Sequence, residues 1–248
     1  MTLEFRKPAP DVWLLRGGRS ESNCYYLPEQ RILVDAGLKK TGRKIVEFLE
    51  REGLGLDWLI LTHADVDHVG GAPAVVQGTG AYAACHRDEA PYVRRGRPRL
   101  FSPSPRGRVL AALAGAQVRL FKPTGPITVS RELVEGDSVA GVMTVHLPGH
   151  SPGSIGLYLP STGYLFAGDA LLTERSAPDS AGSRRDSDTV SFSYPAKWFR
   201  YNSVLAYRSL ERLLRMEISA VFSGHGDPYM GGNQGVRRSL ERLLASPY

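Results

Sequence analysis

The chain has 248 residues, of which 42% are hydrophobic and 23% are charged. This composition is ordinary for a globular protein, and the length suffices for one large domain with a buried core. No apolar run approaches the roughly 20 residues that a membrane span needs, and residues 1–10 lack the apolar segment of a secretory signal. The only cysteines, Cys24 and Cys85, form neither a disulfide framework nor a metal-binding pair. These exclusions favour a cytoplasmic protein.

The net charge of +6 is concentrated in one segment. Between Ala90 and Ser130 the sequence has no acidic residue, and its basic residues are Arg94, Arg95, Arg97, Arg99, Arg106, Arg108, Arg119 and Lys122. Such a block attracts an anionic substrate or nucleic acid, or it is a solvated surface arm. Its prolines and arginines also interrupt the pattern of predicted elements, so we expect an insertion or lid at about 91–126.

The first half of the chain predicts short strands and two helices. The predicted strands are 11–16, 23–27, 31–34, 57–61 and 81–85. One helix is predicted to be capped by Thr41 and to end at Gly53, and a second is predicted at 69–76.

The second half repeats this organisation. The predicted strands are 143–147, 154–159, 164–167 and 220–223, and the predicted helices are 203–216 and 234–244. Residues 176–188 are polar and predict a loop. Strands that come in runs, with helices between the runs, indicate mixed sheets covered by helices.

Gly37–Lys44 (GLKKTGRK) nearly matches the phosphate-binding P-loop. That loop needs a Lys directly after its second Gly, followed by Ser or Thr, whereas Arg43 and Lys44 stand there. The segment therefore lacks the hydroxyl that would bind Mg²⁺.

Gly149–Gly153 (GHSPG) matches the G-x-S-x-G nucleophile elbow of serine hydrolases. The chain order Ser151, Asp169, His225 fits that family as well. The elbow, however, requires a strand, a sharp turn and then a helix, and here a predicted strand follows Gly153. A serine hydrolase is thus a minor alternative.

Thr62–Gly71 (THADVDHVGG) is the strongest motif, because His63, Asp65, Asp67 and His68 follow a predicted buried strand at close spacing. His63 and Asp65 are two residues apart and Asp67 and His68 are adjacent, so the two pairs can address two neighbouring ions. Imidazole and carboxylate ligands suit zinc, iron and manganese. The alternative is that Asp65 or Asp67 caps the following helix and that the histidines are incidental.

This motif resembles the H-x-H-x-D-H signature of the metallo-β-lactamase superfamily, and the resemblance covers roughly residues 12 to 230. Three later fragments fit the family in order: Leu147–Gly153 (LPGHSPG) with His150, Phe166–Ala170 (FAGDA) with Asp169, and Ser223–Pro228 (SGHGDP) with His225. His86 and His146 fall outside the family's ligand positions.

The resemblance implies an α+β fold, an αββα sandwich of two mixed β-sheets flanked by helices, and we expect a single domain over 1–248. It also implies two divalent metal ions, with zinc expected first and manganese or iron as alternatives. One ion would take His63, Asp65 and His150, the other would take Asp67, His68 and His225, and Asp169 would bridge them. Asp65 departs from the family pattern, which has His there, so manganese or iron is an alternative especially at the first site.

The activity implied by the resemblance is that of a glyoxalase II-like metal-dependent hydrolase. A metal-bound hydroxide would attack a small ester, thioester or lactone, and Asp67 would orient the water or accept its proton. The expected partner is a small-molecule substrate, anionic if the arginine block recruits it, and no membrane. The alternatives are a diiron redox or oxygenase-type protein, suggested by the carboxylate at position 65, a phosphodiesterase or nuclease, and a non-catalytic binding protein.

Four aromatic residues follow the predicted loop at 176–188. They are Tyr194, Trp198, Phe199 and Tyr201. We expect them either to line an apolar wall of the substrate pocket or to pack against the next helix.

Overall fold

The computed structural model describes residues 3–18, 21–97, 124–174, 191–197 and 200–245. Most of the predicted insertion at 91–126, including five of its eight basic residues, lies outside these ranges, and so do the predicted loop at 176–188 and the aromatic residues Trp198 and Phe199. The chain forms two compact units, Met1–Val134 and Glu135–Tyr248. Within the described ranges, no helix combines the length and the apolar character that a membrane span requires.

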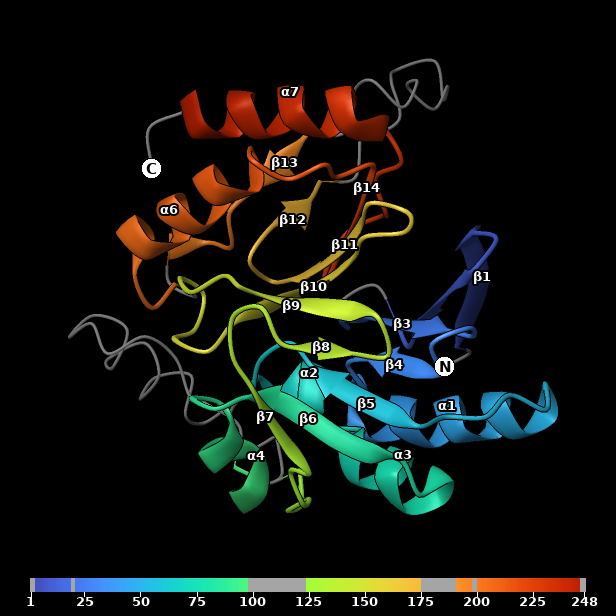
Figure 1. The fold of residues 1–248 in the computed structure, drawn as a ribbon. Helices are drawn as coiled ribbons and strands as arrows, with labels where there is room; N and C mark the ends of the chain where they lie inside the picture. The colour runs from blue at the N-terminus through green and yellow to red at the C-terminus, as the bar shows by residue number, and fades with distance from the viewer. Residues whose placement is uncertain (1–2, 19–20, 98–123, 175–190, 198–199, 246–248) are drawn as a thin grey trace. The chain divides into compact units, whose positions relative to one another are not determined.

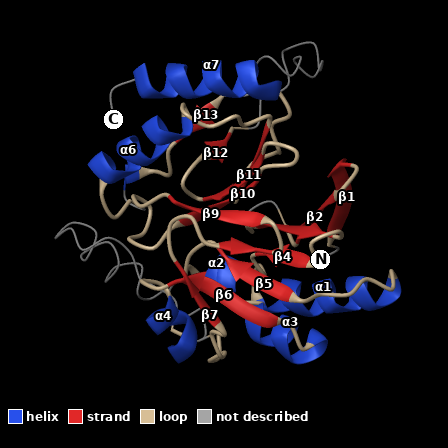
Figure 2. Cartoon of the chain, in the orientation of Figure 1, coloured by secondary structure: helices blue, strands red, loops and turns tan. Residues whose placement is uncertain are grey.

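The first unit is built on a seven-stranded mixed sheet (Figures 1 and 2). Its strands, in spatial as well as chain order, are β1 (Glu4–Ala9), β2 (Val12–Arg16), β3 (Asn23–Leu27), β4 (Ile32–Val34), β5 (Trp58–Leu61), β6 (Tyr82–His86) and β7 (Arg131–Leu133). Strands β1 to β4 pair antiparallel, and β4 to β7 pair parallel. Parallel strands end at the same edge of a sheet, so the residues that follow β4, β5 and β6 gather there.

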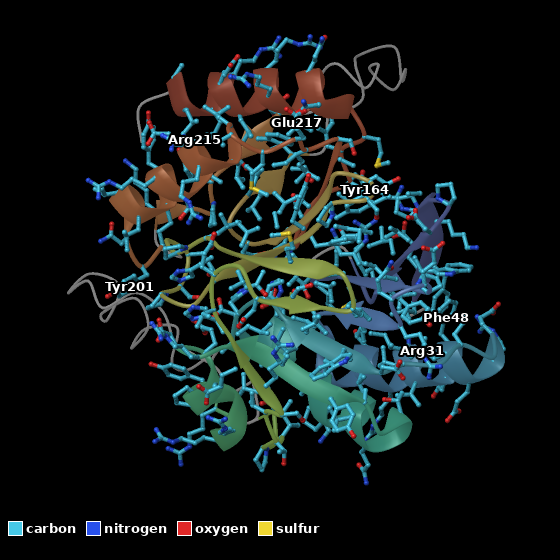
Figure 3. The ribbon with its side chains drawn as sticks, in the orientation of Figure 1. Arg31, Phe48, Tyr164, Tyr201, Arg215 and Glu217 are labelled. Atoms are coloured by element: carbon cyan, nitrogen blue, oxygen red, sulfur yellow. The ribbon has the colours of Figure 1, made fainter. Side chains whose placement is uncertain are left out.

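The described residues of this unit form four helices: α1 (Lys39–Arg51), α2 (Val66–Val69), α3 (Ala72–Thr79) and α4 (Ala90–Arg95). The apolar stripe of α1, with Ile45, Phe48 and Leu49, is buried in the core beneath the sheet. Phe48 (Figure 3) stacks on Phe5 with ring centroids 4.6 Å apart and meets the edge of Trp13 at 5.1 Å. These contacts fix strands β1 and β2 to helix α1.

The second unit contains a five-stranded mixed sheet in the order β14-β11-β10-β9-β8. Its strands are β8 (Ser138–Val139), β9 (Val142–His146), β10 (Ile155–Leu159), β11 (Tyr164–Gly168) and β14 (Ala220–Ser223); β12 (Leu172–Thr173) and β13 (Phe192–Ser193) pair separately. Among these described strands of the sheet, β11 and β14 pair parallel and the other neighbours pair antiparallel. Helices α6 (Ser203–Leu213) and α7 (Gly232–Ala245) bury Leu210, Leu213 and Leu240 in the core of this unit (Figure 1).

The predicted class, α+β with two mixed sheets and accompanying helices, is confirmed. The predicted cap is wrong: α1 begins at Lys39, and Thr41 lies inside the helix with its hydroxyl bonded to Glu21. The helix predicted at 69–76 is two helices, α2 and α3. The chain separates them at Gly71, where a Cβ would lie 2.1 Å from the carbonyl oxygen of Ala36.

Gly42 of α1 touches the backbone of Gly71, and a Cβ on Gly42 would lie 2.3 Å from the Gly71 carbonyl oxygen. Although alanine favours helices, we expect Gly42→Ala to lower the free energy of unfolding by about 1–3 kcal/mol, because the two backbones must separate. Urea unfolding followed by circular dichroism measures this change. The control is Lys40→Ala in the same helix, whose exposed side chain should matter by less than about 0.5 kcal/mol. Equal midpoints for both variants would contradict the prediction.

Candidate metal centre

The first unit presents four predicted ligands on the short segment that follows β5. His63 lies two residues after the strand, Asp65 precedes the first turn of α2, and Asp67 and His68 lie within that helix. Both histidines are fully buried, whereas the carboxylates of Asp65 and Asp67 are about a quarter exposed. The two imidazole rings lie 4.0 Å apart between centroids. The segment therefore gathers all four side chains at one edge of the sheet.

The spacing of these side chains suits a cation. Nε2 of His63 lies 3.7 Å from Oδ2 of Asp65, and Nε2 of His68 lies 3.9 Å from Oδ2 of Asp67. Both distances are too long for hydrogen bonds. Two ligands bound tetrahedrally to one zinc ion, each at about 2.0–2.2 Å, are separated by roughly 3.4 Å. Each pair thus fits the ligand geometry of a metal ion. The carboxylate of Asp65 lies close enough to Nε2 of His63 for both to bind the same ion.

Asp35 organises this segment, and the sequence analysis missed it. It follows β4 in a left-handed backbone conformation, with φ +59°, and is 1% exposed. Its carboxylate accepts hydrogen bonds from the backbone N–H of Thr62 at 2.8 Å, from the Thr62 hydroxyl at 2.7 Å, and from Nδ1 of His68 at 2.8 Å. These three donors satisfy the hydrogen-bonding capacity of the buried carboxylate.

These bonds decide the tautomers of both histidines. An ionised carboxylate only accepts hydrogen bonds, so Nδ1 of His68 must carry a proton. The single hydroxyl proton of Thr62 goes to Asp35, and the Thr62 oxygen, 3.0 Å from Nδ1 of His63, can then only accept. Nδ1 of His63 therefore carries a proton as well. In both rings the lone pair is left on Nε2, the atom that faces the neighbouring aspartate.

Glu89 is a second buried acid that the sequence analysis missed. It follows β6, is fully buried, and accepts a hydrogen bond at 3.1 Å from the backbone N–H of Ala64, between His63 and Asp65. On the other side of the segment, the hydroxyl of Ser22 donates to the carbonyl oxygen of Asp67. The sequence contained a signal for both Asp35 and Glu89. Asp35 comes shortly after β4 and Glu89 shortly after β6, the two parallel neighbours of the strand that leads to His63.

Among the described residues, neither cysteine belongs to a group of side chains whose ligand atoms lie close enough together to hold a metal ion. Burial, and then the negative charge of Asp35, raises the pKa of the Cys24 thiol well above its ordinary value. Burial, and then the charge of Glu89, raises the pKa of Cys85 to about 12. Both side chains are therefore protonated at neutral pH, in agreement with their absence from the predicted ligands.

The second unit presents three predicted ligands, of which two come from parallel strands. Asp169 directly follows β11 and His225 lies two residues after β14, and Nε2 of His225 is 3.5 Å from Oδ2 of Asp169. The single proton of the Thr173 hydroxyl is shared between the carbonyl oxygens of Asp227, at 2.6 Å, and His225, at 3.3 Å. A Cβ at Gly226 would lie 1.8 Å from the Thr173 carbonyl oxygen, so the loop needs glycine there.

The third ligand of this unit, His150, lies on the loop between β9 and β10, which the start of α6 holds in place. Three successive carbonyl oxygens of the loop accept hydrogen bonds: Pro148 from the Ser209 hydroxyl, Gly149 from the N–H of Asn202, and His150 from the N–H of Tyr201. Gly149 has φ +150°, and a Cβ there would lie 2.4 Å from the backbone of Ala206 in α6. The position of His150 thus depends on helix α6.

The serine motif on the same loop lacks its required context. GHSPG is preceded by β9 and followed by β10, so the chain runs strand, loop, strand and no helix follows Ser151. Ser151 is 1% exposed, and its hydroxyl lies 2.8 Å from that of Ser154. These features do not fit an exposed nucleophile at an elbow.

The two histidines outside the predicted ligand set have contacts in loops. Nδ1 of His86 accepts a hydrogen bond from the N–H of Asp88 at 3.2 Å. Nε2 of His146 lies 2.8 Å from the carbonyl oxygen of Pro152 and so helps to close the loop that carries His150.

Known proteins resemble this chain over most of its length. A family model described as the metallo-beta-lactamase superfamily matches residues 17–248. The probable metallo-hydrolase YflN of Bacillus subtilis is 28% identical over 228 residues, which cover 86% of this chain and 83% of YflN. The hydroxyacylglutathione hydrolase of Chromohalobacter salexigens is 27% identical over 168 residues, 65% of this chain and 48% of that enzyme. The crystal structure of TTHA1623 in a di-iron-bound form is similar with a TM-score of 0.62 and 27% identity, over 90% of this chain and 96% of that one.

Asp35→Asn tests the control of the histidines by Asp35. Asparagine offers one acceptor oxygen instead of two, and its amide group would face a donor on Thr62 or His68. We expect metal affinity to fall about 10–100-fold, which is the usual effect of removing a group that hydrogen-bonds to a metal-ligating side chain. Metal content after dialysis, measured by plasma mass spectrometry, and competition with a chromophoric chelator give the affinity.

The matched control is Asp57→Asn, which directly precedes the neighbouring strand β5. Asp57 pairs at the surface with Arg31 (Figure 3), at 2.9 Å, and its removal should leave metal affinity unchanged. Wild-type metal content in a folded Asp35→Asn protein would show that Asp35 does not position the ligands.

Proposed function

The chain belongs to the metallo-β-lactamase superfamily, and from this premise we propose that it hydrolyses a small ester, thioester or lactone with two divalent metal ions. The metallo-β-lactamase fold implies divalent metal ions, and the relative YflN is described as a probable metallo-hydrolase. The observation that carries the proposal is the pair of buried histidines whose Nε2 atoms are prepared as ligands by Asp35. The hydroxyacylglutathione hydrolase relative supports a thioester in particular.

The proposed ligand sets follow the family pattern. One ion would be held by His63, Asp65 and His150, the other would be held by Asp67, His68 and His225, and Asp169 would be shared between them. Each unit by itself supports this assignment, because its predicted ligands lie in close histidine–aspartate pairs at strand ends. Zinc is the first expectation, and manganese or iron is the alternative at the site of Asp65.

When bound, two such ions lower the pKa of water and polarise the carbonyl group of an ester. The residues of the chain supply the geometry and the proton transfer. Asp67 has a carboxylate that is about a quarter exposed, next to His68, so it can accept a proton from an attacking water. Its backbone is held by Ser22 and that of Ala64 by Glu89. The ligands are therefore positioned before the substrate arrives, which favours catalysis.

A di-iron redox protein is the second candidate. Asp65 replaces the usual histidine, and carboxylates are harder ligands that suit iron and manganese better than imidazole does. TTHA1623 was crystallised in a di-iron-bound form. Elemental analysis of protein purified without added metal, together with a panel of ester and thioester substrates, distinguishes this candidate from a hydrolase: iron with no hydrolysis would favour the redox protein.

The metal mechanism and the serine mechanism predict opposite results at adjacent residues. We expect His150→Ala to lose metal and nearly all hydrolysis, whereas Ser151→Ala should keep the metal and most of the activity. The measurements are initial rates on an ester panel, with and without a chelator, and metal content. Complete inactivation by a serine-directed fluorophosphonate, with the metal retained, would sink the proposal.

Asp65 should decide the metal preference of the first site. We expect that site to be the more labile of the two or to hold manganese or iron, and we expect Asp65→His to raise its zinc occupancy because imidazole is the softer ligand. Elemental analysis and anomalous scattering at the zinc and iron edges measure occupancy in both proteins. Two fully occupied and equally tight zinc ions in the unmodified protein would falsify this prediction.

A further inference from the structure

Arg200 is a buried arginine in the segment between β13 and α6. It is 8% exposed. Its Nε donates to the carbonyl oxygen of Pro195 at 2.7 Å, and one Nη donates to the Ser203 hydroxyl at 3.4 Å. The guanidinium carbon lies 5.1 Å from the centre of the Tyr194 ring. All of these partners are neutral groups.

The charge of Arg200 is thus left without a counter-ion from the part of the chain that the structure describes. Burial of a guanidinium is costly unless an anion accompanies it. Accordingly, burial lowers the pKa of Arg200, although a guanidinium stays protonated at neutral pH. Arg16, the other buried arginine among the described residues, shows the usual solution: its Nε and one Nη both bond to the carboxylate of Glu4, at 3.1 and 2.7 Å.

Arg200 directly precedes the residues that hold the loop of His150. The N–H of Tyr201 donates to the carbonyl oxygen of His150 at 3.1 Å, and the N–H of Asn202 donates to that of Gly149 at 3.0 Å. The side chain of Tyr201 is 39% exposed (Figure 3). An anion bound at Arg200 would therefore lie next to an exposed tyrosine, whose backbone N–H is hydrogen-bonded to a proposed metal ligand, His150.

We propose that Arg200 binds a carboxylate group of the substrate, so that the substrate is an ester or thioester that also carries a free carboxylate. A guanidinium has five N–H donors, and the two hydrogen bonds to Pro195 and Ser203 leave three for a ligand. Parallel N–H donors match the two oxygens of a carboxylate, and a single buried positive charge matches a monoanion better than a phosphate dianion. The inference rests on the proposed hydrolytic function.

Two matched pairs of compounds test this inference. The substrates are 4-acetoxybenzoate and its neutral analogue 4-acetoxybenzamide, and the binding probes are the phenols 4-hydroxybenzoate and 4-hydroxybenzamide. The variants are Arg200→Met, which keeps the aliphatic stem without the charge, and Arg200→Lys, which keeps the charge without the planar group. Arg208→Met removes an exposed charge from the nearby helix α6 and is the control for general electrostatics.

We expect Arg200→Met to weaken binding of 4-hydroxybenzoate about tenfold or more, as the loss of hydrogen bonds to a charged group usually does. KM for 4-acetoxybenzoate should rise by a similar factor while kcat changes little. Arg200→Lys should recover part of the loss, and Arg208→Met should resemble the wild type. Binding and hydrolysis of the two neutral amides should change less than twofold in every variant.

Equal losses for the acid and the amide would show that Arg200 only supports the fold, and unchanged binding of the acid by Arg200→Met would also overturn the inference. Binding by calorimetry is measured on purified protein with its metal and does not require turnover. If the wild type hydrolyses neither ester, the proposed function fails, and the binding comparison still decides the role of Arg200. If esters are hydrolysed but 4-hydroxybenzoate is not bound in preference to the amide, only the role of Arg200 is overturned.

Discussion

The hydrogen bonds accepted by the buried carboxylate of Asp35 are the interaction on which the candidate metal centre depends. One acid holds the backbone of the ligand segment through Thr62, fixes His68 directly and fixes His63 through the Thr62 hydroxyl. Leaving a carboxylate buried without partners would cost several kcal/mol, so the three donors and the acid require one another. The same hydrogen bonds of Asp35 thus hold this edge of the sheet together and place the protons of His63 and His68 on their Nδ1 atoms.

The sheet topology explains why these groups meet. Strands β4, β5 and β6 are parallel neighbours, so Asp35, the segment of His63 and the buried Glu89 follow the same edge of one sheet. In the second unit the parallel pair of β11 and β14 brings Asp169 and His225 to 3.5 Å from each other. Placing ligands at the carboxyl ends of adjacent parallel strands allows residues far apart in sequence to lie within ligand distance.

Helix α6 and the residues just before it fix the loop that carries His150. Its first turns contact the loop of His150 so closely that position 149 must be glycine, and the segment leading into it buries Arg200. A proposed metal ligand and a proposed carboxylate site are therefore anchored by the same helix start. Arg16, by contrast, is buried with the carboxylate of Glu4 as its partner.

The sequence alone determined the family, the α+β class and most strand positions, because ligand spacing and apolar periodicity are local properties of the chain. Asn23–Leu27 and Ala220–Ser223 have the predicted bounds, and His63, Asp65, Asp67 and His68 were found from one short motif. Only the tertiary structure decided the roles of Asp35, Glu89 and Arg200, because their significance lies in burial and in partners from other strands and loops. It also decided where α1 begins and why the chain breaks at Gly70 and Gly71 between helices α2 and α3. The physical reason is that a cap or a break depends on which backbone lies within a few ångströms, and that distance is set by packing between segments that are remote in the sequence.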